Sequence, residues 1–499
     1  MSWFFKPMGG IGSVIGGYSS VAYVRPAGTT YGTGDGSSYD NAWAGNAAIV
    51  WEDVLSGGIV YAAGDWNEAL IVGSSNVTIE SVIADPFTVD GTSASLVSGV
   101  SITSKDNVTL NGLTVTNVTT SCFHFDGCLN VITTDCVASL SGNQGFQHLG
   151  VTTFRHNNPT ISNCTDDGIS VHDTGVGFMY GGTLDGNDQN INIVAGAHIT
   201  INDSPTFTGI STVDLYVTNA TTDDSSVITM NGGTVRNIDA NIGGRIVLND
   251  VIVTGTSSLS ASTGNGSMLL NGSILQGGFT GGAGGSLVAN DSRLEVITSI
   301  QCPVEFNRTR VLGDIVTAST VKARNSHLKR VDFQSGGTCD ILYTVFTGMA
   351  ASTFAVSLRT GVTKTNLDNC AFIGSANVGR GIFSQIDVTT NNNICIDLET
   401  GYQRTAGISV INNYCFFDCT TAKAGTITSN SEQTGDPLFT NAGVDDYSLL
   451  EGSSCIGTGA DLGETYDGGI ESADWGDSDT VPVVTSGLQA VSWNIGAYV

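Results

Sequence analysis

Residues 231–235 read Asn-Gly-Gly-Thr-Val, and this pattern of an asparagine leading into an apolar strand returns five times before residue 330. It returns as Asn249-Asp-Val-Ile-Val, Asn271-Gly-Ser-Ile-Leu, Asn290-Asp-Ser-Arg-Leu, Asn307-Arg-Thr-Arg-Val and Asn325-Ser-His-Leu. The successive spacings are 18, 22, 19, 17 and 18 residues. A period close to twenty residues with strand patterning indicates a β-solenoid, in which each repeat is one turn of the chain. The sequence therefore predicts an all-β, single-stranded β-solenoid rather than several ordinary domains.

The asparagines of this repeat are expected to be structural. Asparagine tolerates the left-handed backbone geometry of tight corners. When asparagines stack on successive turns, each side-chain amide can bond the asparagines above and below it. We interpret the Asn-x-Ser/Thr sequences at Asn76, Asn107 and Asn117 in the same way, as turns leading into strands rather than glycan sites.

The composition agrees with an elongated all-β chain. Its 499 residues include 65 glycines, and a solenoid needs turn residues in every repeat. The formal net charge of −28, from 18 basic and 46 acidic side chains, argues against nucleic-acid binding, because phosphate contacts need lysine and arginine. After Lys423 there are twelve carboxylates and no basic residue. Residues 461–479 are therefore expected to form an exposed acidic loop, which could hold a structural Ca²⁺; no other cofactor is predicted.

The cysteines and the N-terminus bear on where the chain folds. Most of the eleven cysteines lie inside hydrophobic strand runs, as Cys136 and Cys370 do, and we interpret them as buried residues of a chain folded in a reducing cytosol. Residues 1–20 lack the charged leader of a signal peptide, and Pro7 with its neighbouring glycines breaks any apolar helix. No stretch is long enough to span a bilayer, so membrane insertion is not expected.

The two ends of the chain carry further signals. The tail contains Asp436-Pro-Leu-Phe, Asp445-Asp-Tyr-Ser-Leu and Asn494-Ile-Gly-Ala-Tyr, and the front contains Tyr23-Val-Arg-Pro-Ala-Gly and Gly58-Ile-Val-Tyr-Ala-Ala-Gly. These segments resemble the closing and opening segments of right-handed parallel β-helix proteins of the pectin-lyase-like class, which include phage tailspike and tail-fibre β-helix proteins. The resemblance implies a right-handed parallel β-helix over nearly the whole chain. It says little about function, because this scaffold carries lyases, hydrolases, epimerases and non-enzymatic spikes.

Four segments are predicted along the chain. Residues 1–20 form a flexible or particle-docking peptide, and residues 21–70 form an N-terminal cap with the first turn. Residues 71–430 form the parallel β-helix, and residues 431–499 form a closing segment that includes the acidic loop. Within the cap, residues 47–55 predict a short amphipathic helix that covers the first turn.

Histidine is the sharpest signal that the fold does not explain. Five of the six histidines lie between positions 124 and 198, and His124, His148 and His172 are evenly spaced along the chain. If the local turns have the same length as this spacing, these three histidines stack on one face of the solenoid. Longer turns commonly build the binding groove of such folds, so His124 and His148, with Arg155 and His156, are predicted to bind substrate.

The richest stretch for chemistry runs from Asn163 to Asp173 and includes Asp166, Asp167 and His172. Paired carboxylates beside a histidine supply an acid and a base of different pKa, as glycosidic cleavage requires. The predicted catalytic residues are therefore Asp166, Asp167, His172 and Asp173. The aspartate pair loosely resembles that of polygalacturonase-type hydrolases, although their Gly-His-Gly and Asn-Thr-Asp segments are absent. A His/Asp ladder that binds nothing and a metal site of unknown ion stay open as alternatives.

A second candidate is a basic cluster in an otherwise acidic chain. Its members are Arg308, Arg310, Lys322, Arg324, Lys329 and Arg330, with His327 among them. Of these, Arg308, Arg310, Arg324 and Lys329 are predicted to bind substrate. The resemblance implies that such residues can neutralise a sugar carboxylate and abstract a proton, as in polyuronate lyases, or bind an acidic glycan without cutting it. Solvated faces of the solenoid are the alternative interpretation.

Three functions follow from these observations. The first is a phage tailspike or tail-fibre-like receptor-binding protein that recognises, and could depolymerise, a host surface polysaccharide. It implies a homotrimer that folds in the host cytosol and joins other virion proteins through its N-terminus. The second is a free, extracellular polysaccharide lyase or glycoside hydrolase. The third is a structural virion decoration protein with no sugar site.

Overall fold

The structure, a computed structural model, describes residues 19–209, 212–218, 226–260, 266–463, 468–477, 479–489 and 493–499. The chain divides into two compact units, Met1–Thr212 (unit 1) and Val213–Val499 (unit 2), and each is described by itself. The docking peptide predicted at residues 1–20 lies outside the described residues except for its last two. No helix among the described residues is long and apolar enough to cross a membrane.

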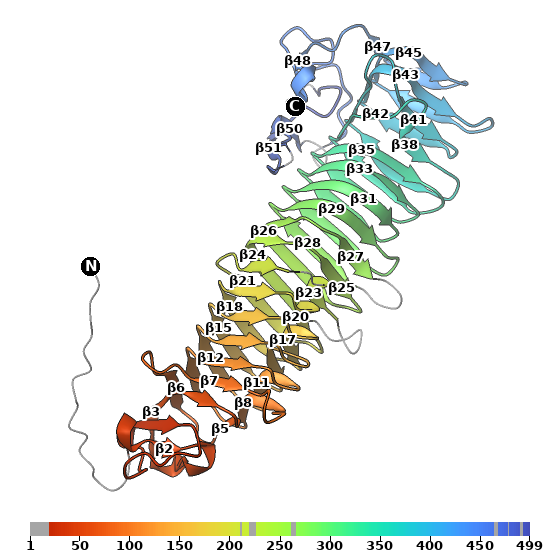
Figure 1. Cartoon of the computed structure of the whole chain (residues 1–499). Helices are drawn as coiled ribbons and strands as arrows, with labels where there is room; N and C mark the ends of the chain where they lie inside the picture. Colours follow the sequence, from red (N-terminus) through yellow and green to blue (C-terminus); the bar gives the residue numbers. More distant parts are fainter. Residues whose placement is uncertain are drawn as a thin grey trace. The chain divides into compact units, whose positions relative to one another are not determined.

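Unit 1 has three columns of parallel strands, and each turn of the chain adds one strand to each column (Figure 1). The first column holds β1 (Ser19–Arg25), β3 (Val54–Ala62), β6 (Val77–Ser81), β9 (Val108–Asn111), β12 (Asn130–Thr134), β15 (Thr153–Asn157), β18 (Val176–Tyr180) and β21 (His198–Asn202). The second holds β4 (Asp65–Trp66), β7 (Thr88–Asp90), β10 (Thr114–Thr116), β13 (Val137–Ser139), β16 (Thr160–Ser162), β19 (Thr183–Asp185) and β22 (Thr206–Thr208). The third holds β5 (Leu70–Val72), β8 (Ser98–Thr103), β11 (Ser121–Asp126), β14 (Phe146–Leu149), β17 (Asp167–His172) and β20 (Gln189–Ile193).

The strand register of unit 1 places like residues above one another. Phe123 pairs with Phe146, which pairs with Ile169, so inward side chains stack turn upon turn. The rings of Phe123 and Phe146 lie 4.6 Å apart at an angle of 11°. Because every second residue of a strand points inward, one apolar position per turn builds a continuous core. Each fully buried apolar side chain contributes about 2–3 kcal/mol to that core.

The predicted capping helix over residues 47–55 is wrong. Two short 3₁₀ helices, η2 (Asn46–Ala48) and η3 (Trp51–Asp53), occupy the segment, and β3 begins directly after them. Between the two helices Ile49 is extended, with φ −68° and ψ 120°, as β-branched side chains favour. The Asn46 side chain accepts a hydrogen bond from the Ile71 backbone N–H, at 2.8 Å. Tertiary hydrogen bonds therefore replace the helix that the apolar spacing predicted.

Unit 2 continues the same construction with longer strands. One column holds β24 (Val227–Val235), β26 (Arg245–Val253), β28 (Ser267–Asn271), β30 (Ser286–Asn290), β32 (Val304–Asn307), β34 (Val321–Arg324), β36 (Thr338–Leu342) and β39 (Thr363–Asp368). The remaining columns hold β23 (Val213–Val217), β25 (Ile238–Asn241), β27 (Ser257–Ser260), β29 (Ile274–Gly281), β31 (Arg293–Ile300), β33 (Arg310–Thr317), β35 (His327–Phe333), β37 (Val345–Phe346), β38 (Phe354–Leu358), β40 (Ala371–Ile373), β41 (Arg380–Ser384), β43 (Ile394–Arg404), β45 (Phe416–Ala424) and β47 (Gln433–Thr434). A separate three-stranded sheet holds β42 (Val388–Asn391), β44 (Val410–Asn413) and β46 (Thr428–Asn430).

The predicted asparagine ladder is confirmed from Asn231 to Asn307. The side-chain amide of each asparagine donates to the oxygen of the one before it, at 2.7, 2.8, 3.0 and 3.0 Å. The prediction is wrong at its last position, because Asn307 pairs with Arg324 and not with Asn325. The left-handed corner residue is the one after each ladder asparagine, such as Asp250 at φ 57°. The ladder asparagines themselves lie in extended strands, and Asn271, Asn290 and Asn307 are the last residues of theirs.

The C-terminal segment leaves the solenoid and packs against it within unit 2. It forms two antiparallel hairpins, β48 (Phe439–Asn441) with β49 (Asp446–Leu449), and β50 (Gly468–Asp474) with β51 (Val483–Leu488). Strand β50 lies inside the segment 461–479, where an acidic loop was expected. The buried side chains of Tyr447, Trp475 and Tyr498 join solenoid residues in one apolar cluster.

All eleven cysteines are free thiols, and ten of them are buried, as expected for apolar core residues. Burial raises the pKa of Cys136 to about 12, so its thiol stays protonated and unreactive.

Candidate functional site

A row of polar side chains runs along the outer face of the third column of unit 1. Strand pairing aligns Ser101, His124, Gln147, Ser170 and Asn192 on five consecutive strands. Their immediate neighbours along each strand are buried core residues, so these side chains point away from the core. Ser170 is itself fully buried, whereas the other four are partly exposed. We call this set the polar row. A line of hydrogen-bonding groups along parallel turns offers a repeated set of contacts to a long polar ligand.

Hydrogen bonds connect the polar row to the predicted aspartate pair. His124 Nδ1 lies 2.8 Å from Gln147 Oε1, and the Ser121 hydroxyl donates to the same oxygen at 3.0 Å. The Ser121 hydroxyl also lies 3.3 Å from Gln144 Oε1, and Gln144 Nε2 donates to Asp166 Oδ2 at 3.2 Å. The structure therefore links His124 in β11 to Asp166, which directly precedes β17 two turns later, through one hydrogen-bond network.

Asp167 is a buried carboxyl group on this surface. Only 2% of the residue is exposed, and its Oδ2 accepts a hydrogen bond from the Asn192 amide at 3.1 Å. Its Oδ1 has no hydrogen-bond partner among the described residues. Burial, together with the charges of Asp166 and Asp188, raises the pKa of Asp167 to about 7 against the opposing effect of hydrogen bonds from Ser170 and Asn192. Asp167 can therefore hold a proton near neutral pH beside the exposed carboxylate of Asp166.

His172 ends β17 and Asp173 directly follows it, but the two side chains differ in what they can do. His172 is partly exposed, and its Nε2 lies 3.2 Å from the Ser170 hydroxyl of the polar row. Asp173 adopts a left-handed backbone at φ 71°, and its Oδ2 accepts a hydrogen bond from the Gly150 N–H at 3.0 Å. His172 therefore belongs to the polar surface, whereas Asp173 stabilises a turn.

The predicted stack of three histidines is wrong. The turns here are one residue shorter than the spacing of the histidines, because His148 pairs with Phe125 and not with His124. His124 pairs with Gln147, and His172 pairs with Leu149. Because side chains alternate faces along a strand, the one-residue slip sends His148 into the core and leaves His124 and His172 outside.

His148 and His156 form a pair inside the core of unit 1. Both are fully buried, and their Nε2 atoms lie 2.9 Å apart. His156 Nδ1 is 2.7 Å from the Thr133 hydroxyl, and the His148 ring stacks on Phe154 at 4.1 Å. Burial lowers the pKa of His156 to about 3 and that of His148 well below its usual value, so both imidazoles are neutral. The prediction that they contact substrate is wrong, because neither side chain reaches the surface.

Arg155 is exposed but lies on the first column of unit 1, in β15. Its guanidinium lies 4.3 Å from the ring centre of Tyr180, and its Nε donates to Asn157 Oδ1 at 2.8 Å. The structure therefore does not bring Arg155 onto the surface that holds the aspartate pair.

Four cations of the predicted basic cluster of unit 2, those expected to bind substrate, each form an ion pair with an aspartate. The pairs are Arg308–Asp291 at 2.6 Å, Arg310–Asp445 at 2.7 Å, Arg324–Asp340 at 2.8 Å and Lys329–Asp314 at 3.1 Å. Three of the aspartates lie one turn of the solenoid away from their partners, and Asp445 lies in the C-terminal segment. These pairs reduce the charge available to neutralise a sugar carboxylate.

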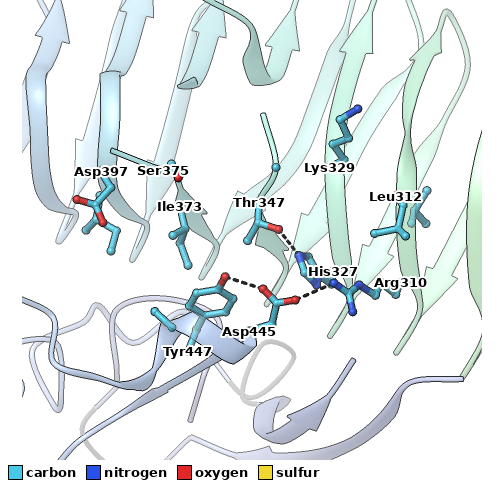
Figure 2. A pocket seen from close by; sticks show the side chains of 15 residues that line it. Arg310, Leu312, His327, Lys329, Thr347, Ile373, Ser375, Asp397, Asp445 and Tyr447 are labelled. Atoms are coloured by element: carbon cyan, nitrogen blue, oxygen red, sulfur yellow. Dashed lines mark hydrogen bonds and ion pairs between the residues drawn. The ribbon is translucent and has the colours of Figure 1, made fainter. Parts of the chain in front are cut away.

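A groove of about 460 Å³ lies in unit 2 between the solenoid and the C-terminal segment (Figure 2). Its floor is formed by β33, β35, β37, β40 and β43 with the residues that follow them, and its wall includes Asp445 and Tyr447. Asp445 accepts from Arg310 Nη2 at 2.7 Å and from the Tyr447 hydroxyl at 3.0 Å. The buried His327 lies 2.5 Å from the Thr347 hydroxyl through its Nε2. Sequence reasoning missed this groove, because its wall lies far along the chain from its floor.

A smaller hollow of about 380 Å³ lies on the polar surface of unit 1, beside His124 and Gln147. Ile71 and Val97 also line it, and they are 53% and 65% exposed. Hydrophobic side chains of that exposure beside hydrogen-bonding groups are typical of ligand sites.

Among the described residues, no group of three or more His, Cys, Asp or Glu side chains is placed to hold a metal ion. The structural Ca²⁺ proposed for the acidic segment stays a prediction.

Comparison with known proteins does not identify a family for the chain. No family profile and no curated protein matches the chain. Among solved structures, the chain is similar to pectate lyase Pel9A, with 12% sequence identity, coverage of 96% of each chain and a TM-score of 0.25. A TM-score this low carries no argument, so the fold rests on the strand pairings described above. The chain is a parallel β-helix protein, as the stacked parallel strands of each unit show.

Proposed function

We propose that unit 1 binds a polysaccharide along the polar row and cleaves it by general acid–base catalysis, with Asp167 as the acid and Asp166 as its carboxylate partner. The observation that carries this proposal is the pairing of one buried and one exposed carboxyl group on a surface lined with hydrogen-bonding side chains. Two adjacent carboxyl groups in different environments can take the two roles that glycosidic hydrolysis needs.

The chemistry assigns a separate role to each group. Asp167 donates its proton to the glycosidic oxygen as the carbon–oxygen bond breaks, and the departing sugar leaves as an alcohol. Asp166 accepts a proton from the water that attacks the anomeric carbon. His124 and Gln147, linked at 2.8 Å, bind hydroxyl groups of the neighbouring sugar residues. His172 does the same on the other side, beside Ser170.

The experiment is to incubate the protein with acidic and host-envelope polysaccharides. New reducing ends and the ultraviolet absorbance of an unsaturated product are followed together. Reducing ends without absorbance are expected, because hydrolysis leaves no double bond. Asp167→Asn and Asp166→Asn should each lower kcat at least 100-fold. Asp135→Asn, at a turn away from the polar row, should not.

Two results would contradict this assignment. Absorbance together with reducing ends would show a lyase and would move the site to Arg324 and Lys329. Cleavage that survives both aspartate substitutions would show that the aspartate pair does not carry the reaction.

We further propose that the protein is a phage tailspike or tail-fibre-like receptor-binding protein, acting as a homotrimer on a host surface glycan within the virion. One support is the resemblance of both chain ends to the opening and closing segments of pectin-lyase-like β-helix proteins, which include phage tailspikes. The other is that the cysteines are free and mostly buried, which suits folding in a reducing cytosol. Sedimentation of the purified chain tests the trimer, and antibody labelling of particles tests attachment. A monomer that is absent from particles would favour a free extracellular hydrolase. A particle component that binds no glycan would favour a structural decoration protein.

A further inference from the structure

We propose that the groove of unit 2 is a second glycan site, which binds a neutral oligosaccharide and takes no part in cleavage. It is formed by five turns of the solenoid and by the C-terminal segment. All the groups that the proposal uses belong to unit 2, and none of them belongs to the polar row of unit 1.

The dimensions of the groove suit an extended chain of sugars. Its floor crosses five consecutive strands of the solenoid, from β33 to β43. Neighbouring strands lie about 4.8 Å apart, so the floor runs for about 19 Å. That length accommodates several pyranose rings laid along the solenoid axis, and the volume of about 460 Å³ falls in the range of small-molecule sites.

The charges along the groove favour an uncharged ligand. Arg310 pairs with Asp445, and Lys329 pairs with Asp314, which Arg330 shares. At the other end, Asp397 is exposed and has no ion pair with any described residue. A sugar carboxylate would therefore meet paired cations and an unpaired carboxylate, which repels it.

The remaining lining offers what a neutral sugar uses. The hydroxyls of Thr347 and Ser375 and the carboxylate of Asp397 can bond sugar hydroxyls. Ile373 and Ile396 supply apolar floor for the C–H faces of the rings. Figure 2 shows Thr347, Ser375 and Asp397 spaced along the solenoid side of the groove, opposite Tyr447.

The wall of the groove is rigid before any ligand arrives. Tyr447 is 4% exposed and packs in the apolar cluster that holds the C-terminal segment. Arg310 ties this segment to the solenoid through Asp445 and through the Gly476 carbonyl, both at 2.7 Å. A preformed wall loses little conformational entropy when a ligand binds, so a few contacts can give measurable affinity.

The experiment measures binding to the full chain in an Asp167→Asn background, so that cleavage cannot interfere. Maltotetraose, cellotetraose and mannotetraose are the neutral probes, and tetragalacturonate is the acidic probe. Saturation-transfer NMR and calorimetry are expected to detect at least one neutral probe and to give at least tenfold weaker binding for the acidic one. Ser375→Trp, which fills the groove, should weaken that binding at least tenfold. Ser409→Trp, at an exposed turn outside the groove, should leave it unchanged.

Three outcomes would overturn the proposal. If none of the neutral probes binds, the groove is not a site for neutral oligosaccharides. Equal binding to the Ser375→Trp and Ser409→Trp variants would place the site elsewhere. Tighter binding of tetragalacturonate would contradict the charge argument. The result does not depend on the proposed catalytic role of unit 1, because that role fails separately if Asp166 and Asp167 variants keep their activity.

Discussion

Replacing Asp167 by asparagine should make unit 1 more stable at neutral pH, although it removes the proposed catalytic acid. The carboxyl of Asp167 is buried against the polar row, and burial raises its pKa from 3.8 to about 7. Folding therefore favours the protonated form. The stability that this preference contributes is fully present below the unfolded pKa of 3.8 and is lost as pH rises through about 7.

The magnitude follows from the size of the shift. A difference of about three pKa units corresponds to about 4 kcal/mol, at 1.36 kcal/mol per unit. Wild-type protein should lose about this much unfolding free energy between about pH 4 and pH 8, over and above its other titrations. The asparagine variant lacks the ionising group and should not lose it. The neutral amide can also keep the hydrogen bond with Asn192 if its oxygen faces that residue.

Urea unfolding of the two proteins at a series of pH values gives the measurement. The difference in unfolding free energy should be small near pH 4 and should grow in favour of Asp167→Asn up to about pH 8. Asp135→Asn is the matched control, since the Asp135 side chain is exposed at a turn away from the polar row and does not act on the pKa of Asp167. A difference that stays constant with pH would refute the reasoning, because it would mean that Asp167 ionises alike in the folded and unfolded chains.

Three further predictions concern the core, the ladder and the C-terminal segment. His148→Phe removes an imidazole whose pKa burial lowers well below 6.5. In the wild-type protein this group makes the unfolding free energy fall as the pH drops below 6.5, so in the variant the slope of that fall should be smaller by about 1.4 kcal/mol per pH unit. Urea unfolding at several pH values measures the slope, and an unchanged slope would contradict the prediction. Asn271→Ala breaks two ladder hydrogen bonds and should cost about 1–3 kcal/mol, whereas the exposed Asn143→Ala should cost under about 0.5 kcal/mol. Arg310→Ala should speed hydrogen exchange across residues 439–449, because the ion pair to that segment is lost; unchanged exchange there would show that packing alone holds it.

The architecture was predictable because a solenoid repeats its chemistry at every turn. Each ladder asparagine needs a partner one turn away, so the spacing from Asn231 to Asn307 is a direct trace of the strand register. The same argument failed at Asn325, since the variable length of the turns is equally compatible with Arg324 as the partner of Asn307. Repetition identifies the fold, but it does not exclude a slip of one residue.

The candidate site shows where such a slip matters. The aspartate pair and the surface position of His124 followed from residue types and their place beside strands. The burial of His148 did not follow from the sequence, because two turn lengths that differ by a single residue place the same side chain on opposite faces of the strand. Its neutral pairing with His156 arises only when the chain closes around both rings.

Local composition and repetition were therefore enough to predict the class of fold and the burial of most cysteines, and to locate the adjacent aspartates Asp166 and Asp167. The tertiary structure alone decided the rest. It buried Asp167 enough to raise its pKa, paired Arg310 with the distant Asp445 and placed the groove against the C-terminal segment. Burial, ion pairing and groove shape depend on which distant segments meet. That depends on the exact register of every turn between them, which the repeat specifies only to within a few residues.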